Sequence, residues 1–238
     1  MDNPENVRAL CHRRFGIGAD GLILLEESDK SDFKMIYFNS DGNEGSMCGN
    51  GGRCITAFAA YLGIISDTTQ FEAVDGLHQA QINSAVTNGF DVSLKMQDVT
   101  DIKNSNGAYI LDTGSPHYVS FCKNTADVDV MQEGKKIRYS EPYKTHGINV
   151  NFISVNENSF SIRTYERGVE DETFSCGTGT VAAAIALDAA NMLQNKNPVK
   201  FDAPGGKLEV SHTKSGNKYT DIWLTGNAIQ VFEGTILL

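Results

Sequence analysis

The sequence has no apolar run long enough to span a membrane, and its first residues, Met1–Glu5, carry neither the basic nor the apolar stretch of a secretory signal. Basic residues are also in the minority, because 20 Lys and Arg stand against 30 Asp and Glu and leave a net charge of −10. An acidic chain is poorly suited to nucleic acid as its main partner, and an anionic substrate would need a local positive site. These absences predict a cytoplasmic globular protein that binds neither a membrane nor a nucleic acid.

A regular cysteine framework is also absent. The five cysteines, an odd number, are scattered through the chain, and no Cys-x-x-Cys or His pair has the spacing of metal ligands. They are Cys11, Cys48, Cys54, Cys122 and Cys176. We expect free thiols in a reducing compartment and no metal site.

Two similar short stretches are the most informative part of what is present. Each places a cysteine directly before a Gly-X-Gly turn that leads into helix-forming residues, at 48–51 and at 176–179. A thiol at a helix start lies among unpaired N–H groups and near the positive end of the helix dipole, which favours the thiolate. The glycines allow the backbone to approach a ligand and to present its N–H groups to a carboxylate. The two loops are therefore the candidates for acid–base chemistry.

The sequence around the two loops is repeated as well. Tyr37 precedes Cys48, and Tyr165 precedes Cys176, by the same 11 positions. Two strand-like runs lead to each loop, and a helix-forming segment follows each one. Corresponding positions drift by a few residues, as loop insertions would produce. The sequence therefore indicates an internal duplication.

The duplication predicts two homologous α/β halves, residues 1–107 and 108–238, each mostly strands around one central helix. The predicted helices cover 4–14, 53–62 and 180–193. The predicted strands cover 22–26, 33–38, 69–74, 78–83, 90–96, 208–212, 220–225 and 229–238. The last of these strands could close either half and is a candidate to complete the first.

Short local signals mark where several of these elements begin and end. Asn3 and Pro4 suit the N-cap and the first position of a helix, and Gly63 suits the position after the second helix. Asn88-Gly89 between alternating segments predicts a hairpin turn. The predicted apolar faces of the first two helices consist of Val7, Leu10, Cys11 and Phe15, and of Cys54, Ile55, Phe58, Ala59 and Leu62.

Two polarised thiols would have a clear chemical use if the halves pack about a pseudo-twofold axis, with the loops facing each other. The α-carbon of an amino acid is a very weak acid, and helix-end N–H groups stabilise the charge that develops on its carboxylate when the proton leaves. One thiolate base and one thiol acid on opposite faces would invert the stereocentre. Plain structural cysteines and a redox pair, with a Cys48–Cys176 disulfide, are the alternatives.

Further motifs accompany the two loops in order along nearly the whole chain. They are Phe38-Asn39-Ser40-Asp41-Gly42, Cys48-Gly49-Asn50-Gly51-Gly52-Arg53-Cys54, Ser115-Pro116-His117, Gly147-Ile148-Asn149, Tyr165-Glu166-Arg167-Gly168 and Cys176-Gly177-Thr178-Gly179. In this combination and spacing the chain resembles the diaminopimelate epimerase family. The resemblance implies an α/β (α+β) fold of two homologous domains, each a mostly antiparallel sheet or barrel wrapped around a central helix.

The resemblance also implies an activity and a set of site residues. The family's enzymes interconvert LL- and meso-2,6-diaminopimelate without a cofactor, for lysine and cell-wall precursor biosynthesis, and a homodimer is the family expectation. Cys48 and Cys176 would be the acid–base pair, with Ser115 and His117 in supporting positions. The implied substrate-binding residues are Asn39, Gly49, Asn50, Asn149, Glu166, Arg167, Gly177 and Thr178. Among these, Arg167 suits a distal carboxylate because a guanidinium can bind it bidentately.

The chain departs from the family's pattern in two places. Ser115 stands where the family commonly has Asn, so one substrate hydrogen bond is expected to be lost or replaced. The family also has an additional strand and an Asn-bearing motif ahead of its first helix, which we expect to be missing here. A racemase of the proline racemase type and a non-catalytic amino-acid-binding protein are the alternative functions. Arg167 and its Asn partners favour a substrate with a second charged amino-acid head over proline.

Overall fold

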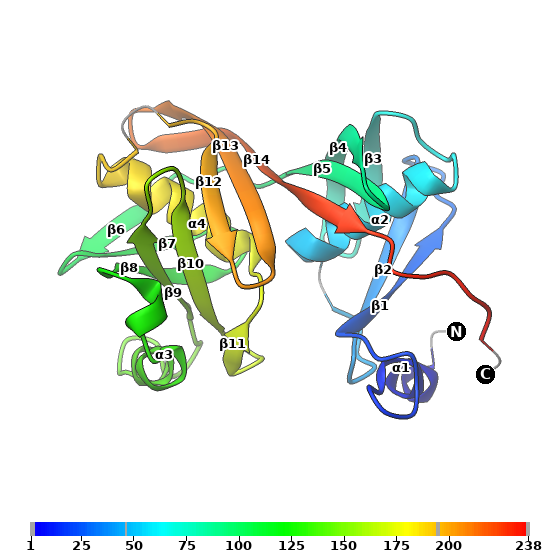
Figure 1. Cartoon of the computed structure of the whole chain (residues 1–238), viewed down its shortest axis with the longest axis horizontal. Coiled ribbons are helices and arrows are strands. Elements are labelled where there is room, and N and C mark those ends of the chain that lie inside the picture. The colour runs from blue at the N-terminus through cyan, green and yellow to red at the C-terminus, as the bar shows by residue number, and fades with distance from the viewer. Residues whose placement is uncertain (1–2, 46, 194–195, 237–238) are drawn as a thin grey trace. The chain divides into compact units, whose positions relative to one another are not determined.

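A computed structural model describes residues 3–45, 47–193 and 196–236 (Figure 1). The fold is a mixed α/β architecture in which the chain forms two compact units. Unit 1 consists of Met1–Leu94 and Asn227–Leu238, and unit 2 is the intervening stretch Lys95–Gly226. The sequence predicts a division at 107/108, whereas the structure divides at 94/95 and returns to unit 1 at 227.

Unit 1 is built on a twisted run of strands with two helices. Its elements are α1 (Pro4–Cys11), β1 (Gly21–Glu26), β2 (Phe33–Asn39), α2 (Gly49–Tyr61), β3 (Thr68–Ala73), β4 (Gly76–Val86) and β5 (Gly89–Lys95). The strands lie in the order β1-β2-β3-β4-β5, and each neighbouring pair is antiparallel except β2 and β3. These two are parallel because α2 connects them and returns the chain to the same end of the sheet.

Unit 2 contains more strands. Its elements are β6 (Ile102–Ser105), β7 (Ala108–Asp112), β8 (Pro116–Phe121), the 3-10 helix Thr125–Asp127, α3 (Val130–Arg138), β9 (Asn149–Val155), β10 (Phe160–Glu166), β11 (Asp171–Thr173), α4 (Gly177–Ala189), β12 (Val199–Ala203), β13 (Gly206–Ser215) and β14 (Lys218–Ile229). The strands lie in the order β6-β7-β8-β9-β10-β12-β13-β14, and β11 pairs with β10. The two parallel pairs, β8 with β9 and β10 with β12, are connected through α3 and α4 respectively.

The two units repeat one topology, as the duplicated loops predict. The path β1-β2-α2-β3-β4-β5 has the same strand pairing as β9-β10-α4-β12-β13-β14, with an antiparallel pair, a parallel pair across the helix and two more antiparallel pairs. The match extends to the helices α1 and α3, which precede β1 and β9. In unit 2, β8 pairs with the outer edge of β9, but within the described part of the chain no strand pairs with the corresponding edge of β1.

The central helices of the two units differ in how completely they are covered. Helix α4 contacts β7, β8, β9, β10 and β13 (Figure 1), and every residue from Thr180 to Leu187 is buried. Helix α2 contacts β1 and β4, and it buries Ile55, Thr56 and Ala59 on that side. The predicted apolar face of α2 is therefore wrong in part. Its exposed members are Cys54, Phe58 and Leu62, which lie on the side of α2 that unit 1 does not cover.

The helix boundaries follow the capping residues rather than the apolar periodicity. Helices α2 and α4 begin at Gly49 and Gly177, earlier than predicted, because Cys48 and Cys176 occupy the N-cap positions. Helix α1 starts as predicted, with the side chain of Asn3 accepting a hydrogen bond from the Glu5 N–H. It ends at Cys11 instead of 14, which leaves Phe15, predicted to be on the apolar face, 89% exposed.

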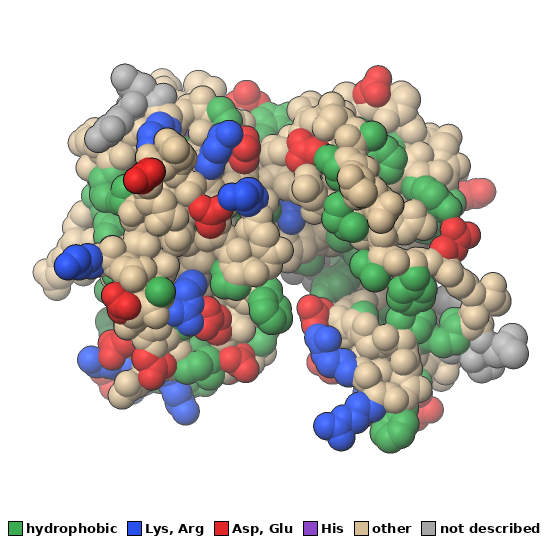
Figure 2. Space-filling view, in the orientation of Figure 1, with side chains coloured by type: hydrophobic (Ala, Val, Ile, Leu, Met, Phe, Trp, Pro, Cys, Tyr) green, Lys and Arg blue, Asp and Glu red, His purple; other side chains and the backbone are tan. Residues whose placement is uncertain are grey.

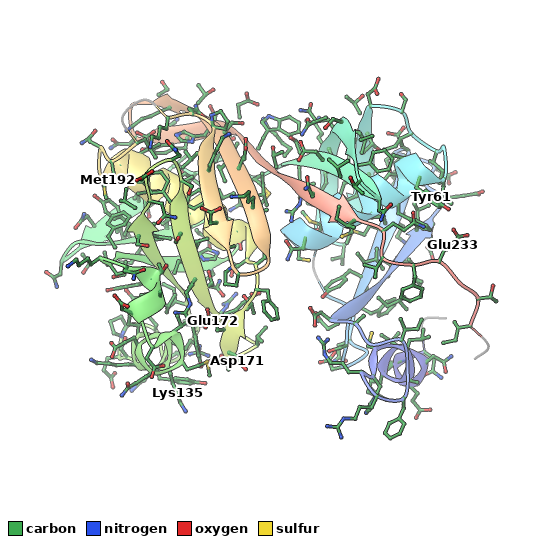
Figure 3. All side chains as sticks on the ribbon, in the orientation of Figure 1. Tyr61, Lys135, Asp171, Glu172, Met192 and Glu233 are labelled. Carbon is green, nitrogen blue, oxygen red and sulfur yellow. The ribbon has the colours of Figure 1, made fainter. Side chains whose placement is uncertain are left out.

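The segment after β14 is the clearest error of the sequence-based prediction. A strand is predicted over 229–238, but β14 ends at Ile229 and residues 230–236 have no regular structure. One backbone bond, from Gln230 N–H to Asn88 O at 2.7 Å, continues the pairing. Beyond it, the segment is attached to α2 by a hydrogen bond from the Tyr61 hydroxyl to the Glu233 carboxylate at 2.7 Å (Figure 3). Helix α3 was not predicted.

Acidic and basic side chains are interspersed over the face of the molecule shown in Figure 2. Among the described residues, no helix combines the length and the apolar character needed to cross a membrane. No group of three or more His, Cys, Asp or Glu side chains in this part of the chain is arranged to hold a metal ion.

Candidate functional site

Cys48 caps helix α2 with its own sulfur. The Gly51 N–H donates to Cys48 Sγ at 3.2 Å, and the Gly52 N–H donates to the Cys48 carbonyl at 2.8 Å. The backbone of Cys48 is extended, with φ −113° and ψ 153°, as an N-cap requires. A sulfur that accepts a helix N–H at the positive end of the dipole is stabilised as the thiolate. The side chain is partly exposed and so remains accessible to a reactant.

Arg53 supports this loop from inside unit 1. Its side chain is buried, donating to the Gly49 carbonyl at 3.1 Å and to Asn50 Oδ1 at 2.9 Å. Within the described residues the guanidinium forms no ion pair, and its Nε has no hydrogen-bond partner. Burial lowers the pKa of Arg53, and the nearby thiols of Cys54 and Cys48 oppose that shift. Arg53 therefore fixes the loop and supplies a buried positive charge near the Cys48 sulfur.

Cys176 occupies the same N-cap position on α4 but is capped differently. Its carbonyl accepts from the N–H and the hydroxyl of Thr180, both at 2.9 Å. Its sulfur makes no capping bond to a helix N–H and lies 3.5 Å from Thr178 Oγ1 instead. Cys176 is 9% exposed, less than Cys48. The two thiols thus share the helix dipole but have different immediate partners.

A buried polar cluster lies behind Thr178. His117 Nε2 is 3.0 Å from Thr178 Oγ1, and His117 Nδ1 is 3.1 Å from Asn151 Nδ2. Asn151 also donates to the Tyr118 carbonyl at 3.1 Å and accepts from the Thr164 hydroxyl at 3.0 Å. Burial, helped by the charge of Arg167, lowers the pKa of His117 to about 3. His117 is therefore a neutral imidazole near pH 7 and is already hydrogen-bonded on both nitrogens.

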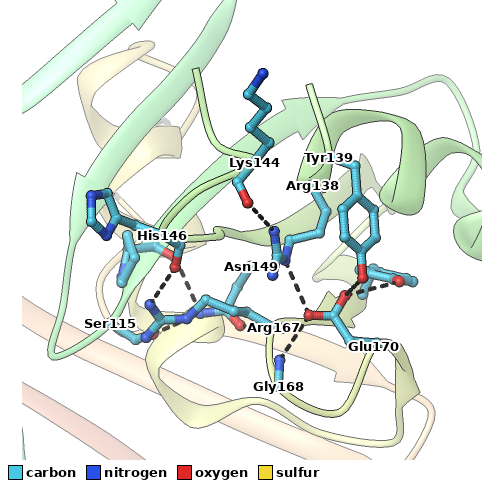
Figure 4. Close-up of polar contacts among 11 residues, drawn as sticks. Ser115, Arg138, Tyr139, Lys144, His146, Asn149, Arg167, Gly168 and Glu170 are labelled. Carbon is cyan, nitrogen blue, oxygen red and sulfur yellow. Dashed lines mark hydrogen bonds and ion pairs between the residues drawn. The ribbon is translucent and has the colours of Figure 1, made fainter. Parts of the chain in front are cut away.

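Arg167 is held by a second cluster in unit 2 (Figure 4). Its backbone N–H donates to Asn149 Oδ1 at 2.9 Å. Ser115 Oγ accepts two hydrogen bonds, one from Arg167 Nη2 at 3.2 Å and one from Asn149 Nδ2 at 2.8 Å. Its Nη1 donates to the His146 carbonyl at 3.0 Å. All these acceptors are neutral, and the described residues contribute no carboxylate ion pair to Arg167. The guanidinium charge therefore stays available for an anionic ligand.

The turn that follows Arg167 is fixed by Glu170 (Figure 4). The Glu170 carboxylate accepts from Arg138 Nε at 3.1 Å and from the Gly168 N–H at 3.2 Å. The hydroxyls of Tyr139 and Tyr165 donate to the same carboxylate at 3.1 and 3.2 Å. Burial raises the pKa of Tyr165 to about 12, and the bond to Glu170 adds to that shift. This network keeps Arg167 in place without neutralising it.

Glu166 and Asn39 end corresponding strands of the two units. Glu166, at the end of β10, accepts a hydrogen bond from the Thr173 hydroxyl at 2.8 Å. Burial raises the pKa of Glu166, and the bond from Thr173 opposes that shift. Asn39 ends β2 and is exposed; its N–H donates to the Asn43 carbonyl, and its carbonyl accepts from the Gly42 N–H, both at 2.9 Å.

The structure thus groups the predicted residues within each unit. Unit 1 carries Asn39, Cys48, Gly49 and Asn50, and unit 2 carries Ser115, His117, Asn149, Glu166, Arg167, Cys176, Gly177 and Thr178. Sequence reasoning assigned no role to Arg53 or Asn151. Both left a signal: Arg53 is a charge in an otherwise uncharged helix, and Asn151 follows Asn149 at a spacing of two, on the same face of a strand.

Comparison with known proteins shows the family. The family model for diaminopimelate epimerase matches residues 1–100 and 109–231. The diaminopimelate epimerase of Flavobacterium psychrophilum is 52% identical over 235 residues, which cover 98% of this chain and 90% of that relative. The diaminopimelate epimerase of Chlorobaculum tepidum is 42% identical over 243 residues, covering 98% of this chain and 91% of the relative.

Solved structures of low sequence identity share the fold. A phenazine biosynthesis protein of the PhzF family from Bacillus anthracis superposes with a TM-score of 0.74 at 15% identity, covering 99% of this chain and 90% of that chain. A probable proline racemase from Agrobacterium radiobacter superposes with a TM-score of 0.66 at 17% identity, covering 99% of this chain and 81% of that chain.

Proposed function

Because the chain belongs to the diaminopimelate epimerase family, whose members are isomerases, we propose that it interconverts LL- and meso-2,6-diaminopimelate. The reaction proceeds without a cofactor, and Cys48 and Cys176 transfer the α-proton. The observation that supports this assignment is the repeated geometry of the two thiols. Each is the N-cap of a 13-residue helix that begins with Gly-X-Gly, in the same place of a repeated topology.

In the proposed reaction one thiolate takes the α-proton from one face of the carbon, and the C–H bonding pair delocalises onto the adjacent carboxylate. The other thiol then gives its proton to the opposite face, so the protonation states of the two cysteines are exchanged in each turnover. The N–H groups of Gly49 and Asn50 and of Gly177 and Thr178 stabilise the developing carboxylate charge. In this scheme no external proton acceptor is consumed.

The substrate's distal amino-acid end binds at the Arg167 cluster. Arg167 has an uncompensated charge for the carboxylate, and Asn149 and Ser115 hold its orientation with the distances given above. Asn39 contributes a further polar contact, and Glu166 is the acceptor for an ammonium group. A proline-type substrate has no second charged head, so this cluster favours diaminopimelate over the proline racemase alternative.

The test is proton exchange followed by NMR. Reduced protein and LL-diaminopimelate in deuterated water should lose the α-proton signal as the meso isomer forms. Cys48→Ser and Cys176→Ser should each lower the rate by at least about 100-fold, because the proton donor or acceptor is removed. Cys122→Ser is the matched control, since Cys122 Sγ donates to the Ile153 carbonyl at 3.4 Å and a serine hydroxyl can do the same.

Two outcomes would contradict the proposal. Exchange that persists in Cys48→Ser and Cys176→Ser would remove the thiols from the mechanism. If the α-proton of proline or trans-4-hydroxyproline exchanges faster than that of diaminopimelate, the activity is of the proline racemase type.

We also propose the setting in which the enzyme acts. The meso product supplies lysine and cell-wall precursor synthesis in the cytoplasm, and the enzyme is a homodimer. Light scattering of the purified protein at several concentrations tests the homodimer directly, and a monomer at all concentrations would contradict it.

A further inference from the structure

Behind Cys176, the heavy-atom positions determine the direction of the hydrogen bonds from Asn151 as far as Thr178. The chain runs from Asn151 through His117 and Thr178 to the Cys176 sulfur, entirely within unit 2. Asn151 and His117 are fully buried, so these bonds cannot be exchanged for bonds to bulk water. The direction follows from the one group in the network that can only accept.

That group is the Tyr118 carbonyl. It lies 3.1 Å from one end of the Asn151 amide, so that end must be the NH2 group, and the other end must be the oxygen that accepts from the Thr164 hydroxyl. The second hydrogen of the same NH2 group points to His117 Nδ1 at 3.1 Å. Nδ1 is therefore an acceptor and carries no proton.

A neutral imidazole without a proton on Nδ1 carries it on Nε2. His117 Nε2–H then donates to Thr178 Oγ1 at 3.0 Å. Because Thr178 Oγ1 accepts from the ring, its own hydrogen is not donated to His117 and can be donated to its other neighbour, Cys176 Sγ, at 3.5 Å. We propose that Asn151 is a positioning residue: it fixes the His117 tautomer so that the Thr178 hydroxyl donates to the Cys176 sulfur and favours the thiolate there.

Titratable side chains also come from the strands that pack against α4. His117 comes from β8, and Glu166 and Arg167 lie at the end of β10, a strand that packs against α4. The charge of Arg167 and the burial of the ring both oppose protonation of His117, which keeps the donated proton on Nε2 alone. Asp188 and His212 pair at the opposite end of the helix.

The first measurement is the tautomer of His117, from long-range proton–nitrogen NMR of the reduced full chain. The ring should show a protonated Nε2 and a bare Nδ1 from pH 6 to 8, with the signal assigned by its loss in His117→Gln. A proton on Nδ1 in the wild-type protein would overturn the proposal directly, without any variant of Asn151.

The second measurement is the pH profile of Cys176 alkylation by iodoacetamide, quantified by mass spectrometry. Asn151→Asp replaces the NH2 donor with an acceptor, so the ring proton should move to Nδ1 and the Thr178 hydroxyl should turn to Nε2. The Cys176 profile should then move up by about one pH unit, a tenfold lower thiolate fraction near pH 7. Cys48, in the other unit, is the internal reference and should keep its profile.

Thr178→Val and Thr178→Ser form a second, independent pair. Valine removes the donated hydroxyl at nearly constant volume and should move the Cys176 profile upward, whereas serine keeps the hydroxyl and should leave it near wild type. An unchanged Cys176 profile in Thr178→Val would overturn the proposal and reduce the network to a packing role. This pair decides the question if Asn151→Asp does not fold.

The inference rests on the proposed function in one respect: the epimerase reaction is what gives a thiolate at Cys176 its use. Neither readout uses diaminopimelate. If the NMR and alkylation results hold and no α-proton exchange is seen, the epimerase proposal fails and the network stands. If α-proton exchange is seen and the Cys176 alkylation profile is the same in Asn151→Asp, Thr178→Val and the wild type, the proposed role of the network is wrong and the epimerase proposal stands.

Discussion

The starts of α2 and α4 both present a cysteine thiol, but the two thiols have different kinds of neighbour. Both place a cysteine at the N-cap before Gly-X-Gly. The buried charge of Arg53 lies near Cys48, whereas neutral His117 contacts Thr178, which in turn contacts Cys176. A charge acts over several ångströms whatever its orientation, whereas a hydrogen-bond chain acts only through its geometry. The first thiol should therefore respond to removal of a charge, and the second to a change in donor direction.

The glycine three positions after each cysteine gives the largest expected contrast. A Cβ on Gly179 would lie 2.4 Å from Asn151 Oδ1, which is buried and held, whereas a Cβ on Gly51 would meet the flexible end of Met35, Cε at 3.0 Å. Gly179→Ala should lower α-proton exchange by at least about 100-fold and the free energy of unfolding by about 2–3 kcal/mol. Gly51→Ala should cost less than about tenfold in rate and about 1 kcal/mol or less. Equal effects of the two substitutions, in exchange rate and urea unfolding, would remove this distinction.

Arg53 is the next test, because α4 has a buried valine, Val181, at the corresponding position. Arg53→Met removes the N–H groups that donate to Asn50 Oδ1 and to the Gly49 carbonyl. It should lower the free energy of unfolding by about 1–3 kcal/mol. It should also raise the pH at which Cys48 is alkylated, because an opposite charge favours the thiolate. Mass spectrometry of the same samples should show no change at Cys176.

The control for this test is Arg53→Lys, which keeps the charge and loses the forked geometry. It should retain most of the Cys48 alkylation profile. If the lysine and methionine variants shift Cys48 equally, the guanidinium acts through its hydrogen bonds and not through its charge.

The next effect is expected from acid. The folded pKa of His117, about 3, lies below its ordinary value of 6.5, so between these values the unfolded chain takes up a proton that the folded chain does not. Stability should therefore fall as the pH decreases through this window, by up to about 1.4 kcal/mol per pH unit from this group. The midpoint of urea unfolding between pH 7 and 4 should fall less steeply in His117→Gln. Parallel curves for the two proteins would exclude His117 as a source of acid lability.

The smallest expected effect concerns two exposed tyrosine–carboxylate pairs, one in each unit. Tyr61→Phe removes the bond to Glu233 and should cost less than about 1 kcal/mol, with faster amide exchange over 230–236. Tyr139→Phe removes the corresponding kind of bond to Glu170, which keeps its contacts with Arg138 and Gly168, so amide exchange after Arg167 should change little. Hydrogen exchange followed by mass spectrometry measures both regions in one experiment.

The repeated plan could be predicted from the sequence because local signals and topology agree there. The N-cap at Asn3, the position of Gly63 after α2 and the hairpin predicted from Asn88-Gly89 all depend on interactions within a few residues. The first two are present as predicted, and the hairpin is present with its turn one residue earlier, at Thr87 and Asn88, because Gly89 already pairs with Val86. The duplicated cysteine loops likewise allowed the repeated topology to be predicted. These features need no knowledge of distant contacts.

Other features depended on contacts that the sequence does not show. The apolar face of α2 was misplaced because only one side of that helix is covered in unit 1, which leaves Phe58 48% and Leu62 50% exposed. The strand predicted over 229–238 has apolar residues but, past the bond at Gln230, no strand partner in the described residues. Asn151 could be suspected from its polar character, but its role depends on His117 and Tyr118 of β8 and on Thr164 of β10, two strands that flank β9.

The discontinuity of unit 1 has a consequence for the order in which the protein is made. Unit 2 is one uninterrupted stretch, 95–226, whereas the core of unit 1 includes Ala228 packed with Ala57 and Val92. On the ribosome, all of unit 2 emerges before Ala228 does. The half whose synthesis begins first is therefore the half that is completed last, although domains usually fold from the N-terminus during translation.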